Sequence, residues 1–293
     1  MFDSILQPAI AYARKDFLEA IRDRRLIAVS IILGAILIGT SAAVASFMVS
    51  TTTPGSGAGN VPDPFDVWLN GTSGVLTGIA FGVTTVVLPF LPMLAASRGL
   101  ERDRARGIYQ LSLAKPIPPW GPALGKFVGL YAALAIPTVA ISGGVVFAIY
   151  AVAGAYPSGG LLGVFVGANV ILVGLYLLLT LCVGAFLPQE LVGPLALLVW
   201  VGFNALEQTG FYITARFMTI LGADQAVTYQ SAWTDLATFT GLYHGLLAPA
   251  VPGELGFVVG TFDVAQVVPW AILVWFVGVY FAYAILLWRM PSR

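Results

Sequence analysis

Six long apolar stretches constrain the fold of this 293-residue chain more than any other feature. They occupy residues 26–50, 74–97, 127–153, 161–187, 193–207 and 265–288, and the fifth is the shortest. A hydrocarbon core about 30 Å thick takes ~20 apolar residues per helix, and backbone groups in lipid must be paired within their own segment. We therefore predict an all-α integral membrane protein with six transmembrane helices.

The basic residues indicate how these helices are oriented. Thirteen of the 14 Lys and Arg residues lie before the first stretch, between the second and third, or after the last, and only Arg216 lies elsewhere. Because Lys and Arg near span ends stay on the cytoplasmic side, this distribution places the N- and C-termini of a multi-pass cell-membrane protein in the cytoplasm.

Composition excludes several alternatives. Charged residues make up 10% of the chain, against about 25% in soluble domains. The single cysteine, Cys182, permits no disulfide within the chain. The first apolar stretch is longer than the ~7 to 15 residues of a signal peptide core, so we expect an uncleaved anchor rather than a leader.

Residues 1–25 have the pattern of an amphipathic helix. Its apolar positions are Leu6, Ile10, Ala13, Phe17 and Ile21, and the opposite side carries Lys15, Glu19, Arg22 and Asp23. Such a helix lies along the inner membrane surface. A generic anchor that only orients the first span is equally compatible with this pattern.

The internal segment 98–126 carries eight charged residues, six of them within 98–106. It can be helical to about Leu113, after which Pro116 and the prolines beyond it end the helix and form a stiff elbow. Glu101 is expected to pair with Arg104. The segment has the character of a docking surface, although a positive-inside anchor with incidental charge pairs fits the same residues.

Residues 208–264 form the longest predicted non-cytoplasmic segment. The segment is acidic and rich in aromatic residues, among them Phe239 and Tyr243. A disordered loop would contain fewer aromatic side chains, so we expect short helices that lie on the outer leaflet or dip into it.

Together these elements resemble the ABC-2 type permease family. The N-terminal helix has the form ARKDFLEAIRDRRLI at residues 13–27. The internal loop matches the family pattern of an acidic pair, a Gly, a leucine-rich turn, a Pro and a final Gly-Lys, here Glu101, Asp103, Gly107, Leu111, Leu113, Pro116, Gly125 and Lys126, followed by Phe127. The motifs cover residues 11–129, and the six-span layout extends the likeness over the whole chain.

Within that family the chain is most similar to the subgroup associated with nitrous oxide reductase maturation, often labelled copper-related. It departs from the usual Gly-Thr of the loop by having Ile108, so no role of that hydroxyl carries over.

The resemblance implies an ABC transporter permease of a single transmembrane domain, residues 1–293. Such a permease pairs with a second copy as a homodimer and with separate cytoplasmic ATPase subunits. The loop between spans two and three, residues 98–126, would be the coupling helix seated in the ATPase, and the N-terminal helix would brace it. The matching positions are Glu101, Arg102, Asp103, Arg104, Arg106 and Gly107.

The residues themselves argue against catalysis by this chain. Gly121 to Phe127 resembles a phosphate loop, but it is one residue short and ends in Phe instead of Ser or Thr. One His, one Cys and five scattered Met residues do not form a transition-metal site. An intramembrane enzyme built on Glu207 and His244 lacks a second convergent group. We therefore expect no enzyme activity, no cofactor and no metal.

A transport pathway needs polar groups, and no ionisable residue lies at mid-span, so the driving force is expected from elsewhere. The candidates for lining a pathway are Asn169, Trp200, Phe203, Asn204 and Glu207. Helix–helix packing is the alternative role for the two asparagines. Two glycine stripes, Gly74-Gly78-Gly82 and Gly159-Gly163-Gly167, are spaced for close helix approach.

Two classes of function fit these observations. One is the permease subunit of an ABC transporter, which couples ATP hydrolysis on another chain to export. The other is a non-transporting membrane scaffold or assembly factor whose internal loop docks a different cytoplasmic partner. No sequence feature identifies the substrate, the direction of transport, or an outer partner of residues 208–264.

Overall fold

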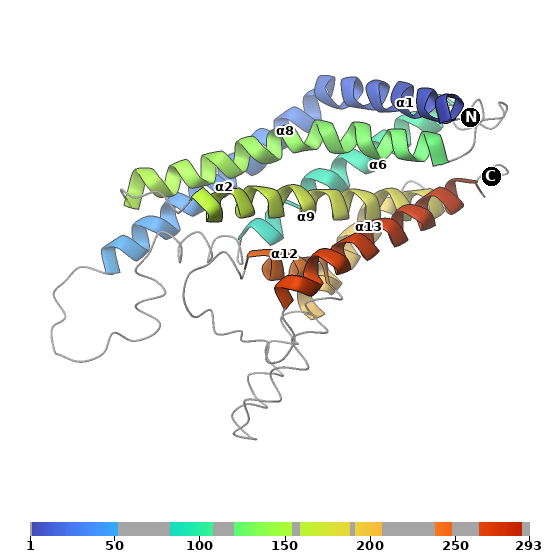
Figure 1. The fold of residues 1–293 in the computed structure, drawn as a ribbon. Coiled ribbons are helices and arrows are strands. Elements are labelled where there is room, and N and C mark those ends of the chain that lie inside the picture. Colours follow the sequence, from blue (N-terminus) through green and yellow to red (C-terminus); the bar gives the residue numbers. More distant parts are fainter. Residues whose placement is uncertain are drawn as a thin grey trace.

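The computed structural model describes residues 2–51, 83–107, 120–153, 159–187, 191–206, 238–247 and 264–288. All regular elements among them are helical (Figure 1). The labelled helices are α1 (Phe2–Arg22), α2 (Arg24–Thr51), α5 (Thr85–Val87), α6 (Phe90–Ala105), α8 (Trp120–Ala153), α9 (Gly159–Phe186), α12 (Phe239–Leu247) and α13 (Val264–Trp288). A further helix, Leu191–Leu206, carries no label. The all-α prediction is confirmed for these residues.

Four helices are long and apolar enough to cross a membrane, over Arg24–Ser46, Gly121–Val152, Leu162–Phe186 and Val267–Leu286. They coincide with the first, third, fourth and sixth predicted stretches. Of the fifth stretch the structure describes the helix Leu191–Leu206, and this described part is about 24 Å long at 1.5 Å per residue. Six spans were predicted, and the described residues contain four helices that qualify as spans.

The second predicted stretch, 74–97, is not one continuous helix. Its first nine residues lie outside the described part, and α5 ends at Val87, with Leu88 as the C-cap directly before Pro89. This break is the expected effect of a ring that lacks a backbone donor. Pro137 and Pro269, by contrast, lie inside α8 and α13, and both helices continue past them.

Helix α9 is the centre of the bundle. It contacts α6, α8, α12 and α13, and its middle turns from Leu172 to Leu178 are buried without interruption. A helix that is apolar all round is expected to be surrounded by others. The remaining helices are thus positioned relative to α9.

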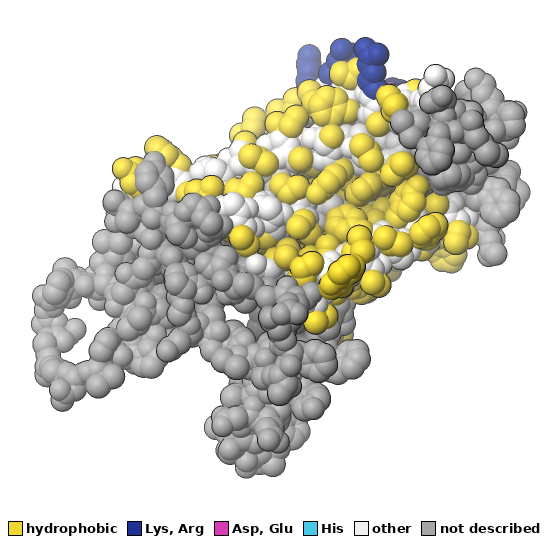
Figure 2. Space-filling model, viewed as in Figure 1, with side chains coloured by type: hydrophobic (Ala, Val, Ile, Leu, Met, Phe, Trp, Pro, Cys, Tyr) yellow, Lys and Arg dark blue, Asp and Glu magenta, His cyan; other side chains and the backbone are white. Residues whose placement is uncertain are grey.

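The outer surface of the bundle is apolar along its length. Ile31 of α2, Leu198 of the helix Leu191–Leu206 and Val274 of α13 are 66%, 65% and 69% exposed. Figure 2 shows hydrophobic side chains spread over the visible flank of the bundle. A continuous apolar exterior of this kind fits a solvent of lipid chains rather than water.

Helix α1 packs along the first part of α8, the most extensive contact between any two described helices. Ala9 lies against Gly125 and Ala13 lies against Gly129, so the two helices run parallel. A Cβ on either glycine would collide with the α1 backbone. The start of α1, the start of α8 and the end of α13 lie at one end of the bundle (Figure 1), which we call the charged end.

The predicted glycine stripe of α9 has a different environment. A Cβ on Gly163 or Gly167 would meet nothing within 4 Å among the described residues. These two glycines therefore make no close helix contact among the described residues, and a contact with a second copy stays a prediction. The equivalent spacing in α8, Gly125 with Gly129, makes the close approach instead.

Candidate functional site

Helices α1 and α6 face each other with complementary charges at the charged end. The acidic stripe is Asp16 and Glu19 of α1 with Asp23 directly after it, and the basic stripe is Arg98 and Arg102 of α6 with Arg106 directly after it. Steps of three and four residues place each stripe on one side of its helix. Arg106 Nη1 lies 2.6 Å from Glu19 Oε1, and Asp23 lies 3.6 Å from Arg98 and 3.7 Å from Arg102. The helices therefore meet antiparallel.

Behind these outer pairs lies the buried ion-pair cluster, defined as Lys15, Asp16, Asp103 and Lys126. Lys15 Nζ donates to Asp103 Oδ1 at 2.6 Å, and Lys126 Nζ donates to Asp103 Oδ2. Lys126 also donates to the carbonyl of Gly99 at 3.1 Å, and its ammonium lies 3.8 Å from Asp16. Two carboxylates and two ammonium groups balance, and the cluster joins α1, α6 and α8.

The pKa values of the two carboxylates in this cluster are shifted in opposite directions. Burial raises the pKa of Asp103, but the ion pairs and hydrogen bonds with Lys126 and Lys15 outweigh burial and hold that pKa below its ordinary value. Burial also raises the pKa of Asp16, and there the attraction of Lys126 and Lys15 is too weak to cancel it. Asp103 is thus the anchored anion, whereas the charge on Asp16 opposes folding.

Replacing Asp16 by asparagine is expected to stabilise the protein at neutral pH. The pKa of Asp16 is higher in the folded protein than its ordinary value of 3.8. The contribution of Asp16 to the free energy of unfolding is therefore favourable below pH 3.8 and is lost as the pH rises through the folded-state pKa. The advantage of Asp16→Asn should therefore be full at pH 7 and shrink as the pH falls toward 4. Melting temperatures in detergent at several pH values measure this, and an advantage independent of pH would contradict it.

For Asp103 we expect the opposite dependence of stability on pH. With its pKa depressed, its ionisation contributes stability above about 3.8 that is lost as pH falls through the folded value. Asp103→Asn serves as the matched comparison in the same titration, because it should cost stability at pH 7 and cost less in acid.

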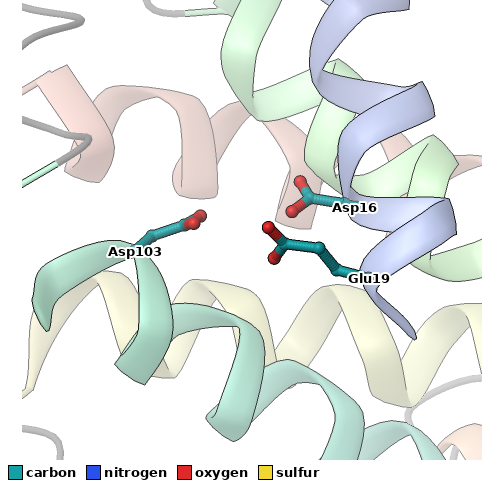
Figure 3. A group of neighbouring side chains, drawn as sticks. All are labelled: Asp16, Glu19 and Asp103. Atoms are coloured by element: carbon teal, nitrogen blue, oxygen red, sulfur yellow. The ribbon is translucent and has the colours of Figure 1, made fainter. Parts of the chain in front are cut away.

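Asp16, Glu19 and Asp103 present carboxylate oxygens within 4.8 Å of one another (Figure 3). Such a group resembles a divalent-cation site. However, the ammonium groups of Lys15 and Lys126 already contact Asp103 and lie within 4 Å of Asp16. The positive charge that these carboxylates need is supplied by the chain itself, so we interpret the cluster as an ion-pair network.

The six predicted coupling residues have distinct environments. Glu101 is exposed and, among the described residues, makes no ion pair, so its expected pairing with Arg104 is wrong. Arg104 instead donates to the carbonyls of Gly184 and Leu187, at 2.6 and 3.1 Å, at the C-terminal end of α9. Lysine or arginine at that position satisfies carbonyls that a helix end leaves unpaired. Arg104 thus links α6 to the central helix.

Helix α6 ends earlier than predicted. It stops at Ala105, not near Leu113, because Gly107 adopts φ +62° and its N–H bonds to the carbonyl of Arg104 at 3.0 Å. A left-handed glycine just past the last turn is a common helix terminator. Gly107 therefore has a structural role here. The elbow was predicted between Leu113 and Lys126; its residues up to 119 lie outside the described part, and residues 120–126 are instead the helical start of α8.

The predicted pathway residues separate into two groups. Asn169 is buried in α9; its amide donates to Ser142 Oγ of α8 at 2.9 Å, and it accepts from the Tyr243 hydroxyl of α12 at 2.7 Å. These bonds tie three helices together, which supports the packing role for Asn169. The hydroxyl of Ser142 in turn donates a hydrogen bond to the carbonyl of Thr138 at 2.8 Å.

The other group lies on the helix Leu191–Leu206. Trp200 donates to the carbonyl of Thr85 at 3.2 Å, and Asn204 donates to the carbonyl of Trp200 within its own helix at 2.9 Å. Phe203 meets Phe239 of α12 edge to face, with ring centroids 5.0 Å apart. Glu207 and the side chain of His244 lie outside the described residues. Helix α12, within the segment where short helices are expected, is the element that contacts both groups.

Sequence reasoning missed the members of the buried cluster other than Asp103. The sequence patterns place Lys126 in a basic flank and in the Gly-Lys of the loop motif and Lys15 on the polar side of an amphipathic helix, and they give Asp16 no role. The available signal was a lysine directly followed by 27 uncharged residues of the third apolar stretch, because a charge at such a place is expensive unless paired.

The fold and the site define a helical integral membrane protein whose internal loop helix is held by ion pairs to its N-terminal helix. A family model described as ABC-2 family transporter protein matches residues 10–259. The chain therefore belongs to the ABC-2 transporter family: it is a membrane permease component of an ABC transporter, a class that works with a partnering ATPase subunit. No curated protein matches the chain.

Proposed function

We propose that this chain couples ATP hydrolysis on a separate cytoplasmic ATPase to export of a substrate, working as a homodimer with both termini in the cytoplasm. The observation that carries this proposal is the buried ion-pair cluster. It fixes the C-terminal end of α6, from which the segment 108–119 departs, to α1 and α8 at once.

Coupling requires that a push on one segment moves several helices together. Asp103 joins α6 to α1 and α8, and Arg104 joins the same turn of α6 to the end of α9. Ion pairs and hydrogen bonds that are buried hold a defined geometry, since a buried charge without its partner is costly. A load applied beyond Gly107 would therefore reach α1, α8 and α9.

Other parts of the proposal have separate support. The start of α1 and the end of α13 lie at the same end of the bundle (Figure 1), and this end carries the bases that favour the cytoplasmic side. A homodimer follows from the family resemblance. Membership of the nitrous oxide reductase maturation subgroup stays a prediction on which the proposal does not depend.

Reversing the charge of Glu101 tests docking without disturbing the fold. Glu101 is exposed on α6 beside the buried cluster, so Glu101→Arg should leave the melting temperature unchanged. If α6 docks an ATPase, recovery of the ATPase with the tagged permease from detergent extracts should fall about fivefold to tenfold, as expected for ~1 to 1.4 kcal/mol lost at an interface rim. Co-purification with quantified subunit ratios measures this effect.

Gln7→Arg is the matched control, because it also adds an exposed arginine at the charged end, on α1. ATPase recovery that is equal for Glu101→Arg and the unmodified chain would contradict docking through this turn of α6. Recovery of a stoichiometric partner without ATPase activity would instead support the scaffold function.

A further inference from the structure

The outward side of α1 combines arginines with bulky aliphatic residues. The arginine patch is Arg14, Arg22, Arg24 and Arg25, all exposed at the end of α1 and the start of α2. On the same side of α1, Ile10, Leu18 and Ile21 are 58%, 37% and 41% exposed. Water is a poor solvent for the aliphatic residues, and lipid chains are a poor solvent for the guanidinium groups, so this surface fits neither medium alone.

The arginine patch has no counter-charge from the described residues, which pair none of its four members. The nearby carboxylates pair with other basic side chains, and Asp23 Oδ1 meets the patch only through the backbone N–H of Arg25, at 3.0 Å. Asp16, Glu19 and Asp23 all lie against α6 or α8. Figure 2 shows Lys and Arg side chains gathered along one edge, over the end of α1, and no acidic side chain on that face.

The patch also lies where a bilayer surface would be. The membrane-crossing stretch of α2 begins at Arg24, and Ile27 and Ile31, 44% and 66% exposed, continue the apolar surface from there. The boundary between headgroups and acyl chains accommodates arginines and aliphatic residues on one surface. Guanidinium groups bind phosphate through paired hydrogen bonds, and basic clusters beside a span attract anionic lipids.

We propose that the arginine patch, with Ile10, Leu18 and Ile21, is a binding surface for anionic phospholipid headgroups of the adjoining leaflet. The aliphatic side chains enter the acyl region, and the four guanidinium groups hold lipid phosphates. The ion pairs of the acidic stripe with α6 and α8 make this possible, because they remove from the outward side of α1 the carboxylates that would repel an anionic lipid. The proposal does not depend on the identity of the cytoplasmic partner.

Local lipid selectivity around α1 tests the proposal in the full-length chain. A bimane label on Leu18→Cys, in a chain with Cys182→Ser, is quenched by brominated lipids in vesicles of phosphatidylglycerol and phosphatidylcholine. Comparing brominated phosphatidylglycerol with brominated phosphatidylcholine gives their relative association constant at that position. We expect a preference on the order of tenfold for phosphatidylglycerol, and removing one of the four arginines should lower it roughly fivefold, to about twofold.

Three comparisons make the result specific. The same label on Ile32→Cys, on the exposed side of α2, should show no preference, and changing the four arginines to lysine should preserve most of it, whereas changing them to glutamine should abolish it. Since the patch is exposed, all variants should elute as the unmodified chain. Raising the salt concentration on the unmodified chain should remove the preference without any substitution.

Equal quenching by the two lipids at position 18 of the unmodified chain would overturn the proposal, and so would a preference that survives the four Arg→Gln changes. Inorganic phosphate, added at constant ionic strength, separates a lipid from a soluble ligand. Loss of the preference at millimolar phosphate would assign the patch to free phosphate and reject the lipid surface.

Discussion

Changing Lys126 to methionine is expected to destabilise the protein by about 3 to 5 kcal/mol, the usual result of leaving a buried charge without its partner. Lys126 is 2% exposed, and its ammonium contacts Asp103 and lies within 4 Å of Asp16. Without it, two buried carboxylates share Lys15, whose side chain is 26% exposed. The free energy of unfolding in mixed detergent micelles measures this loss.

A double variant and a surface variant make the experiment specific. Lys126→Met with Asp103→Leu removes both charges, so it should recover part of the stability that Lys126→Met alone loses. Arg106→Met breaks the pair with Glu19, but Arg106 is 54% exposed, so the cost should be below ~1 kcal/mol. If Lys126→Met and Arg106→Met cost the same, the cluster is not buried as the structure has it.

Gly129→Ala is expected to cost about 1 to 3 kcal/mol, although alanine is the better helix former. A Cβ at this position would lie 2.9 Å from the Cα of Ala13, so α1 must move away from α8. That movement would also separate Lys15 and Asp16 from Lys126. Thermal unfolding in detergent should show a lower melting temperature.

The control lies on the same helix. Within the part of the chain that the structure describes, a Cβ on Gly143 would meet nothing within 4 Å, so Gly143→Ala should be neutral or should stabilise by up to ~1 kcal/mol. Opposite signs for Gly129→Ala and Gly143→Ala would confirm that contact with α1, and not helix propensity, decides the outcome. A stabilising Gly129→Ala would contradict the close packing of α1 on α8.

Helix positions were well predicted because hydrophobic length decides them. The predicted stretches 26–50, 161–187 and 265–288 differ by two residues or fewer at each end from α2, α9 and α13. Helix α8 begins at Trp120, seven residues before its predicted start, because these early residues pack on α1 and need no uniform apolar pattern. A threshold on hydropathy cannot detect a helix that is stabilised by a neighbouring helix.

The coupling role of the candidate site stays a prediction, and the contacts of its residues could not be predicted from the sequence. The charged turn of α6 was singled out by charge density and by family resemblance, yet its six residues differ in role. Asp103 is buried between two lysines, Arg104 holds the end of α9, Gly107 ends the helix, and Glu101 remains exposed. Charge density along the sequence does not distinguish these roles.

The sequence by itself determined that the chain is a helical membrane protein, which segments are apolar enough to span, and where its charges gather. Each of these properties depends on residues that are neighbours along the chain. Only the tertiary structure decided which glycines bring helices together and which charges are buried. Lys15 meets Asp103 across 88 positions, and Arg104 meets Gly184 across 80, because helices distant in sequence pack side by side. Such pairings depend on the direction in which each helix turns its side chains, which no local pattern records.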